Sequence, residues 1–487
     1  MSALALIAII VLLLVLRQNL IVILFIVGGY VHLVYGAGQL EYMIQDMWTG
    51  ADKEVLLSIP LFILAGNVMT RGSIAERLIA IVRSATAWLP GGMAAATILS
   101  CAVFAAISGS STVTLLAVGA VMYPALLKGG YSKRYAMGAI CAGGTLGIII
   151  PPSIPMILYG ISTEASITDL FIAGIGPGLL LTAMFTVHAL IVNRHMPHAP
   201  VSRRGLYYLF TAPLVVLALQ PHYWSFVVQA TRPRAVAAGA PGGTPGGVSL
   251  IDDYRPPAAF ADYFAAMPAG IRELGRALAF GGPAALLPVI ILGGIYTGWF
   301  TATESAAIGL AYALLVEIFV HRELRLRDFY TVALETTKLL GSLFPILAIA
   351  LSLNLLLTEQ RVPQSLVEFM TGAVESKAAY LLIVNVLLLI VGCFMDVGSA
   401  ILIVAPLIWP IAEAYGIDKT HFGIIMTVNL EIGFLTPPVG LNLIVAMSAF
   451  KEDFGFICRS VLPFIAMMLV ALAAVSWIPE IALYLVR

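Results

Sequence analysis

The sequence predicts an all-α membrane protein that crosses the bilayer many times. Hydrophobic residues make up 60% of the 487 residues and charged residues only 11%, whereas soluble domains carry about 25% charged residues. Long apolar runs recur along the chain, without the alternating pattern of a membrane β-barrel. The length allows about ten to twelve helical crossings. A soluble enzyme, a disordered chain and a basic nucleic-acid-binding protein are excluded, because the net charge is also zero.

Residues 1–92 are predicted to form scaffold helices and a first surface helix. The apolar run 3–16 has no basic residue before it and no small-residue cleavage site, so it is interpreted as a membrane helix rather than a removable signal. Further spans are expected over 20–36 and 55–70, joined by an acidic outer loop. The charged, amphipathic segment 73–88 is expected to lie along the membrane surface.

Residues 93–192 are predicted to form a hairpin, a broken helix and a final span. The apolar runs 93–107 and 112–127 are short, and small polar residues rather than charges separate them. We interpret them as a re-entrant hairpin that enters and leaves on one side. The run 135–161 is long enough to cross but is interrupted by two prolines, and irregular backbone at membrane depth must be buried or line a cavity.

The second half follows the same order after a linker. Residues 193–283 are interpreted as a mostly cytoplasmic linker, in which the 14-residue apolar segment Leu206–Leu219 is an interfacial helix rather than a span. Scaffold helices and a second surface helix, 321–337, are expected within 284–376. A second hairpin, 379–394 with 399–412, a second broken helix, 421–449, and a final span are expected within 377–487.

A shift of 286 residues superimposes the two halves. It aligns identical residues at positions where helices break or end, among them Gly147 with Gly433 and Pro151 with Pro437. Interruptions at matching places in two halves are typical of transporters with internal repeats. Basic loops near 124–134 and 321–328 are assigned to the cytoplasm by the positive-inside rule. The halves then have opposite orientations, and the N-terminus is periplasmic.

Hydroxyl groups cluster at the tip of the first hairpin, in Ser108-Gly-Ser-Ser-Thr-Val-Thr114. Two half-helices end there, and their free N–H and C=O groups present partial charges to a cavity. The hydroxyls could alternatively only cap the helix ends. We predict that Ser108, Ser110 and Thr112 contact a substrate. Ser110 and Ser111 are also predicted to contact Na⁺, because hydroxyls and carbonyls are hard oxygen ligands.

The two proline pairs mark the second kind of candidate site. A proline inside a helix frees carbonyl oxygens of the preceding turn, which could coordinate a cation without formal charge. A kink used only for packing is the alternative. The recurrence in both halves favours Na⁺ sites, for which we predict Gly147, Pro151, Gly433, Thr436 and Pro437.

Lone carboxylates supply the third candidate site. Asp396 is the only charged residue in 379–412, and Glu431 is the only one in 421–449. Carboxylates at membrane depth are costly and mark function, although each could instead cap a helix or pair with a distant cation. Asp396, with Ser399 and Asn442, is predicted to bind substrate. Glu431 is predicted to have a structural or coupling role.

Glu304, in Thr301-Ala-Thr-Glu304, is interpreted mainly as a helix cap, with a coupling role as the alternative.

Motifs of enzymes are missing from the sequence: there is no phosphate-binding loop, no His-Glu-x-x-His and no Gly-x-Ser-x-Gly. The four cysteines have no metal-ligand spacing and are interpreted as packing residues. We therefore expect neither an enzyme nor a resident cofactor.

Several motifs together resemble one transporter family. The segments Ile59–Met69, Ser108–Thr114, Gly147–Ser153, Thr301–Ala307 and Gly433–Gly440 look like the large membrane (M, DctM-like) subunit of tripartite ATP-independent periplasmic (TRAP) transporters. The resemblance covers roughly 20–195 and 283–487. It implies a permease of the bacterial inner membrane that imports small organic acids, such as C4-dicarboxylates, by Na⁺ symport and an elevator mechanism.

The same resemblance implies a small membrane (Q) subunit and a periplasmic substrate-binding (P) protein as partners. The chain departs from the family pattern in its long 193–283 segment and in Ala302, where the family has proline. No extra N-terminal bundle is evident, so a separate small subunit is expected. A stand-alone Na⁺/H⁺ antiporter or dicarboxylate symporter of similar design remains an alternative, and a membrane enzyme or a non-transporting complex subunit is a further one.

Overall fold

The computed structural model describes residues 2–16, 18–36, 38, 40–196 and 269–486. Every regular element in these ranges is a helix, and no strand occurs in them. Ten helices of the described part are long and apolar enough to cross a membrane. This agrees with the predicted class, an all-α protein that crosses the membrane many times. The interfacial helix predicted over Leu206–Leu219 lies outside the described residues.

The first half begins with helices that the apolar runs predict, and continues with a hairpin and a broken helix. The initial elements are α1 (Ser2–Val15), α2 (Leu20–Tyr35), α3 (Leu40–Ala51), the short η1 (Glu54–Leu57), α4 (Ser58–Arg71) and α5 (Ile74–Thr86). They are followed by α6 (Gly92–Ser108), α7 (Ser111–Lys128), α8 (Lys133–Ile149), α9 (Ile154–Thr163) and α10 (Ile167–Val192).

The second half ends with the same series of elements. It starts with α14 (Ala269–Tyr296), α15 (Ala302–Leu315), the π-helical η2 (Val316–Val320), α16 (Leu326–Glu359) and α17 (Val362–Ala373). The hairpin and broken helix then follow as α18 (Lys377–Phe394), α19 (Val397–Ala414), α20 (Lys419–Phe434) and α21 (Leu441–Phe450), before α22 (Phe454–Trp477) and α23 (Glu480–Leu483).

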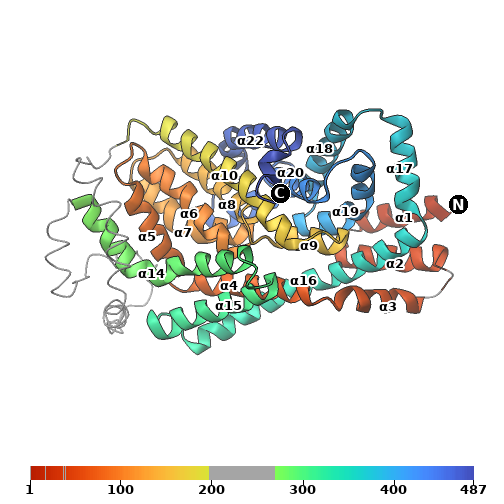
Figure 1. Ribbon diagram of the computed structural model, residues 1–487, viewed down its shortest axis with the longest axis horizontal. Helices are drawn as coiled ribbons and strands as arrows, with labels where there is room; N and C mark the ends of the chain where they lie inside the picture. Colours follow the sequence, from red (N-terminus) through yellow and green to blue (C-terminus); the bar gives the residue numbers. More distant parts are fainter. Residues whose placement is uncertain (1, 17, 37, 39, 197–268, 487) are drawn as a thin grey trace.

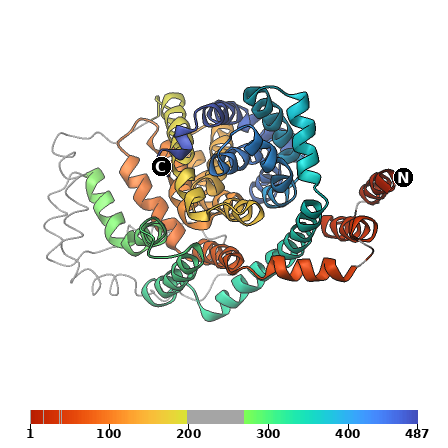
Figure 2. The ribbon, with the colours of Figure 1, turned by 45° about the vertical axis from the view of Figure 1, so that its right-hand side comes forward.

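The helices form a compact bundle and an arc beside it. The bundle contains α6 to α10 and α18 to α22, so the hairpins and broken helices of both halves pack together (Figure 1). Figure 2 shows α4, α14, α15 and α16 along one side of this bundle, with α1 to α3 at the end of the arc. We call these two parts the core bundle and the arc. α16 contacts both α4 and α19, so it lies where they meet.

Local backbone preferences explain the two sharp hairpin turns. α6 ends at Gly109, whose φ of 61° lies in the left-handed region that glycine adopts without strain. Ser110 is extended, and α7 starts directly after it. In the second hairpin, Asp396 is extended and its carboxylate accepts the Ser399 N–H, which caps α19. The two-residue turns bring each pair of half-helices together.

Three elements differ from the prediction. The expected outer loop contains the helix α3, which packs on α16. The expected surface helix 321–337 is not separate, because α16 runs without a break from Leu326 to Glu359. α14 starts at Ala269, inside the predicted linker. The amphipathic segment 73–88 does form a helix, α5, and its Arg77 is buried against Glu323 and the Phe280 carbonyl.

Candidate functional site

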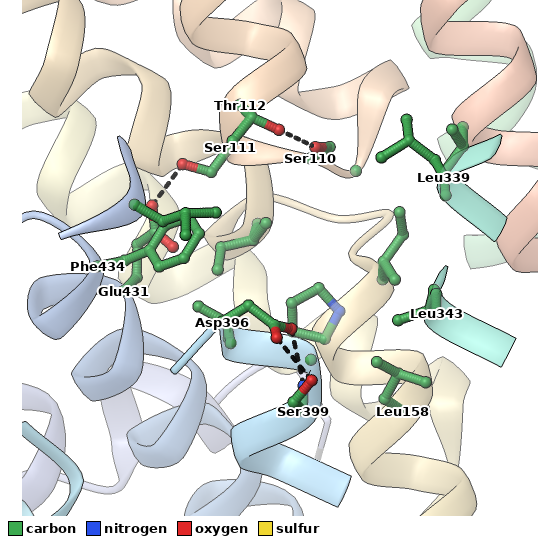
Figure 3. A pocket seen from close by; sticks show the side chains of 18 of the residues that line it. Ser110, Ser111, Thr112, Leu158, Leu339, Leu343, Asp396, Ser399, Glu431 and Phe434 are labelled. Carbon is green, nitrogen blue, oxygen red and sulfur yellow. Dashed lines mark hydrogen bonds between the residues drawn. The ribbon is translucent and has the colours of Figure 1, made fainter. Parts of the chain in front are cut away.

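A cavity of about 340 Å³ lies between the tips of the two hairpins. Its polar residues come from both halves of the chain, and its apolar residues include contributions from α4, α8, α9, α16, α20 and α21. Figure 3 shows the hydroxyls of the first hairpin at the top, Asp396 and Ser399 below them, and Leu339 and Leu343 along the right-hand side. The polar residues that line it are Ser110, Ser111, Thr112, Ser342, Asp396, Ser399 and Glu431.

The first hairpin presents an open helix start to this cavity. The Ser110 side chain does not cap α7, because its hydroxyl lies 3.2 Å from the Thr112 hydroxyl instead. The first N–H groups of α7 therefore keep their partial positive charge, which suits a bound anion such as a carboxylate. Ser108 lies just behind this surface and does not line the cavity. Its hydroxyl is 2.8 Å from that of Thr114.

The second hairpin presents a carboxylate at the matching place. Asp396 accepts the Ser399 N–H at 2.9 Å and the Ser399 hydroxyl at 2.6 Å. Asp396 therefore both caps α19 and lines the cavity. This side of the cavity favours a cation or a hydrogen-bond donor, whereas the start of α7 favours an anion. The asymmetry matches the 286-residue alignment of Asp396 with Ser110.

Glu431 joins the two halves at the cavity wall. The Ser111 hydroxyl of α7 donates to Glu431 Oε1 at 2.5 Å, and Asn442 Nδ2 of α21 donates to the same oxygen at 3.1 Å. Asn442 Nδ2 also contacts the Ser111 hydroxyl. Asn442 is buried and does not line the cavity. Ser111, Glu431 and Asn442, for which the sequence suggested three different roles, thus belong to one cluster.

Two predicted glycines allow each hairpin tip to touch its own broken helix. A Cβ added to Gly147 would lie 2.5 Å from the Ser110 carbonyl oxygen and 2.6 Å from the Thr114 hydroxyl. A Cβ on Gly433 would lie 2.6 Å from the backbone of Gly392. Both positions therefore require the absence of a side chain. Backbone bonds complete each junction, from the Ile154 N–H to the Gly109 carbonyl and from the Gly440 N–H to the Cys393 carbonyl.

The remaining residues predicted for Na⁺ lie at the breaks but outside the cavity lining. Pro151 is buried in the first break, whereas Pro437 is exposed in the second. The Thr436 hydroxyl donates to the Ile432 carbonyl, four residues earlier in the chain, at 2.7 Å. The structure thus brings Ser110, Ser111, Thr112, Asp396, Ser399 and Glu431 into one cavity, and leaves the proline breaks behind it.

Glu304 has a structural role outside this cavity. It forms a capping box at the start of α15, in which the Thr301 hydroxyl accepts the Glu304 N–H at 3.2 Å and Glu304 Oε2 accepts the Thr301 N–H at 2.8 Å. Both side chains of the box are exposed to some degree, and neither lines the cavity. The capping interpretation of Glu304 is confirmed.

Removing this cap should affect stability and leave substrate handling unchanged. We expect Thr301→Ala to lower the free energy of unfolding by about 1 kcal/mol, the usual contribution of an N-cap. Thr297→Ala serves as the control, because Thr297 directly follows α14 and its hydroxyl contacts only carbonyls of that helix, those of Gly293 and Gly294. Thermal unfolding of the purified chain measures both. An equal loss in the two variants would contradict the capping role.

Sequence reasoning missed the wall that α16 contributes. Leu339, Ser342, Leu343 and Ile346 line the cavity from this helix, together with Ile63 of α4. The Ser342 hydroxyl donates to the Leu339 carbonyl at 2.7 Å. The small pair Gly341-Ser342, shortly before Pro345, was an available signal in an otherwise apolar run. It was not distinctive enough to single out this helix.

Comparison with known proteins identifies the family. The profile described as "Tripartite ATP-independent periplasmic transporter, DctM component" matches residues 6–481. The chain belongs to this family. It is a TRAP transporter large permease subunit and a multi-pass membrane protein, not an enzyme. The resemblance noted from the sequence motifs is thereby confirmed.

Several relatives of this permease have names that state different substrates. The C4-dicarboxylate TRAP transporter large permease protein DctM of Pseudomonas aeruginosa is 36% identical, and the match covers 94% of this chain and 92% of that one. The ectoine TRAP transporter large permease protein TeaC of Halomonas elongata is 32% identical over 94% and 92%. The isethionate permease DctMQ of Oleidesulfovibrio alaskensis is 34% identical, and the match covers 92% of this chain but 61% of that one.

A solved structure supports the fold of the permease. The YdaH transporter of Alcanivorax borkumensis aligns with a TM-score of 0.55 at 14% identity, covering 91% of this chain and 89% of that one. This likeness concerns the fold alone. Large permeases of the TRAP family work with a periplasmic binding protein and a small membrane subunit.

Proposed function

We propose that this permease imports small organic acids across the bacterial inner membrane by Na⁺ symport, with substrate delivered by a periplasmic binding protein. The observation that carries the proposal is the cavity between the two hairpin tips, with an uncapped helix start on one side and Asp396 on the other. The N–H groups of α7 would hold the substrate carboxylate. Asp396 and the nearby hydroxyls would hold the cation or a polar group of the substrate.

In this proposal Na⁺ is cargo that moves with the substrate. The oxygen atoms at the hairpin tips and breaks are the hard ligands that such an ion requires. Ser110, Ser111 and Gly147 would contribute to a site in the first half, and Gly433 and Thr436 to a site in the second. Bound cations would offset the substrate's negative charge in a cavity with little charge of its own.

We further propose that the halves are inverted repeats and that the core bundle moves as one body against the arc. Two reciprocal contacts support this. Lys133 at the start of α8 pairs with Glu452, after α21, at 2.7 Å. Lys419 at the start of α20 donates to the Thr163 carbonyl, at the end of α9, at 3.0 Å. The 286-residue shift aligns these two lysines, and each one reaches across to the other half.

Breaking the first of these contacts should weaken uptake moderately. Lys133→Glu places two carboxylates together, so we expect a roughly twofold to fivefold loss of uptake, in line with the 0.2–1 kcal/mol that exposed ion pairs contribute. The double variant Lys133→Glu/Glu452→Lys should restore most of it. Lys128→Glu, an equal charge change on an exposed residue of the same loop, is the control. Failure of the double variant to recover would argue against the contact.

The proposed orientation and partners complete the assignment. With the halves inverted, the N-terminus faces the periplasm and the basic loops near 124–134 and 321–328 face the cytoplasm. A separate small membrane subunit would accompany this chain. The relatives' names span a dicarboxylate, ectoine and isethionate, so the common substrate class is a small, polar and anionic or zwitterionic molecule.

Reconstitution tests this function directly. The chain would be placed in liposomes with its small subunit, and uptake of candidate organic acids would be measured with and without a Na⁺ gradient and the binding protein. We expect uptake only when both are present. Uptake that needs the Na⁺ gradient but no binding protein would instead indicate a stand-alone symporter, and uptake that ignores the gradient would contradict Na⁺ coupling.

A further inference from the structure

The C-terminal end of α9 has three main-chain carbonyls that its own helix cannot satisfy. The chain turns at Glu164, whose φ of 58° is left-handed, and the N–H groups of Glu164 and Ala165 both donate to the Gly160 carbonyl. The carbonyls of residues 161–163 receive no N–H from the described main chain. These three residues are buried, so their carbonyls need partners from other elements.

Three side chains supply these partners, one for each carbonyl. Lys53 Nζ donates to the first carbonyl, that of residue 161, at 3.5 Å. Asn354 Nδ2 donates to the second at 3.4 Å, and Lys419 Nζ donates to the third at 3.0 Å. The C-terminal end of a helix carries a partial negative charge, which the two ammonium groups also favour. The end of α9 is thus held by three donors that are far apart in the sequence.

Two of these donors lie on the arc, and the third lies in the core bundle. Lys53 directly precedes η1, which leads into α4, and Asn354 belongs to α16. Lys419 starts α20 and therefore belongs to the core bundle, like α9 itself. The side chains that α16 presents to the cavity are mostly apolar, and apolar contacts have no preferred direction. Hydrogen bonds are directional, so those of Lys53 and Asn354 fit one position of the core bundle against the arc.

We propose that Lys53 and Asn354 form a latch that holds the end of α9 to the arc in the present conformation. This inference rests on the movement of the core bundle that belongs to the proposed function. A displacement of a few ångströms breaks both bonds, because they are already near the upper limit of hydrogen-bond length. Lys419 moves with α9 and keeps its bond. The latch therefore lowers the free energy of the present conformation relative to a displaced one, and it sets the ratio of the two.

A distance measurement tests the latch without relying on transport. Spin labels at Thr168→Cys of α10 and Glu359→Cys of α16, both exposed positions, report the separation of the core bundle from the arc. Cys458, the one native cysteine that is not buried, is replaced by serine. The chain is measured with its small subunit in lipid nanodiscs. Lys53→Met and Asn354→Leu should each raise the ratio of displaced to present conformation by about twofold to tenfold, the effect of losing one hydrogen bond.

The chain provides a matched control for this measurement. Lys419→Met removes the same kind of donor from the neighbouring carbonyl, but within the core bundle, so the ratio should stay at its wild-type value. Lys53→Arg keeps a charged donor and should also match the wild type. The effects of Lys53→Met and Asn354→Leu should multiply in the double variant, because they free different carbonyls. An unchanged ratio in the double variant would overturn the latch, and so would an equal shift in Lys419→Met.

Uptake into liposomes separates the latch from the proposed function. Lys53 is exposed, so Lys53→Met should fold and can be assayed beside the wild type. If the distances shift as expected but the wild type takes up no organic acid, the proposed function fails and the latch stands. If the wild type does take up the acid but the double variant keeps the wild-type distances, the latch fails and the function stands.

Discussion

Replacing Asp396 by asparagine is expected to lower uptake roughly tenfold to hundredfold and to leave the fold intact. Asparagine can still accept the Ser399 N–H, so the cap on α19 is kept. The variant loses the negative charge, which in our proposal faces the cation or a donor group of the substrate. It also replaces the oxygen that accepts the Ser399 hydroxyl by an amide nitrogen. A hydrogen bond to a charged group contributes about 1.5–3 kcal/mol, which corresponds to the expected loss.

The chain offers a matched control for this experiment. Asp453 caps α22 in the same way, accepting the Phe456 N–H at 3.0 Å, but it is exposed and does not line the cavity. Asp453→Asn should transport like the wild type. Na⁺-dependent uptake by reconstituted Asp396→Asn, Asp453→Asn and wild-type protein gives the comparison. Equal uptake in all three would remove Asp396 from the site.

Alanine at Gly147 or at Gly433 is expected to destabilise the core bundle by about 1–3 kcal/mol, the usual effect of inserting a methyl group into a well-packed interior. The new Cβ would lie 2.5 Å from the Ser110 carbonyl oxygen in the first case and 2.6 Å from the Gly392 backbone in the second. Neither neighbour is the flexible end of a side chain, so the hairpin tip itself must shift. Uptake should fall with stability, because both tips form the cavity.

Gly293→Ala separates this clash from a general effect of glycine substitution. Gly293 lies within α14, and no atom approaches its added Cβ within 4 Å. Alanine should be tolerated there or should stabilise the helix by up to about 1 kcal/mol. Thermal unfolding of the three variants and their uptake should be measured together. If Gly147→Ala were as stable as Gly293→Ala, the close contact between hairpin and broken helix would be wrong.

The hairpins and broken helices could be predicted because local residues determine them. Gly109, the polar residues of the turns and the two proline pairs favour helix ends, so the helix breaks could be located without tertiary information. The helix of the expected outer loop, α3, was missed because its charged residues obscured a short amphipathic pattern. The sequence analysis divided α16 into a surface helix and a span where its charged residues end, but the helix continues through this point without a break.

The candidate site was predictable residue by residue but not as an assembly. Ser111 and Glu431 were each identified from composition, yet their contact joins positions 320 residues apart in the chain. The wall from α16 was invisible for another reason. Apolar side chains that face lipid and those that face a protein cavity have the same chemistry, so hydropathy does not distinguish them.

The composition of the α16 wall has a mechanical consequence. Among its four cavity residues, three are apolar, and the hydroxyl of Ser342 is already bonded to the carbonyl of Leu339. The directional polar contacts of the cavity therefore come from the hairpins and Glu431, all within the core bundle. In the movement that we propose for the core bundle, a bound solute would travel with its own ligands past a mostly apolar wall. The solute would then exchange no hydrogen bonds with the arc during translocation. The free-energy barrier to this movement would depend on the shape of the α16 wall rather than on its polar groups.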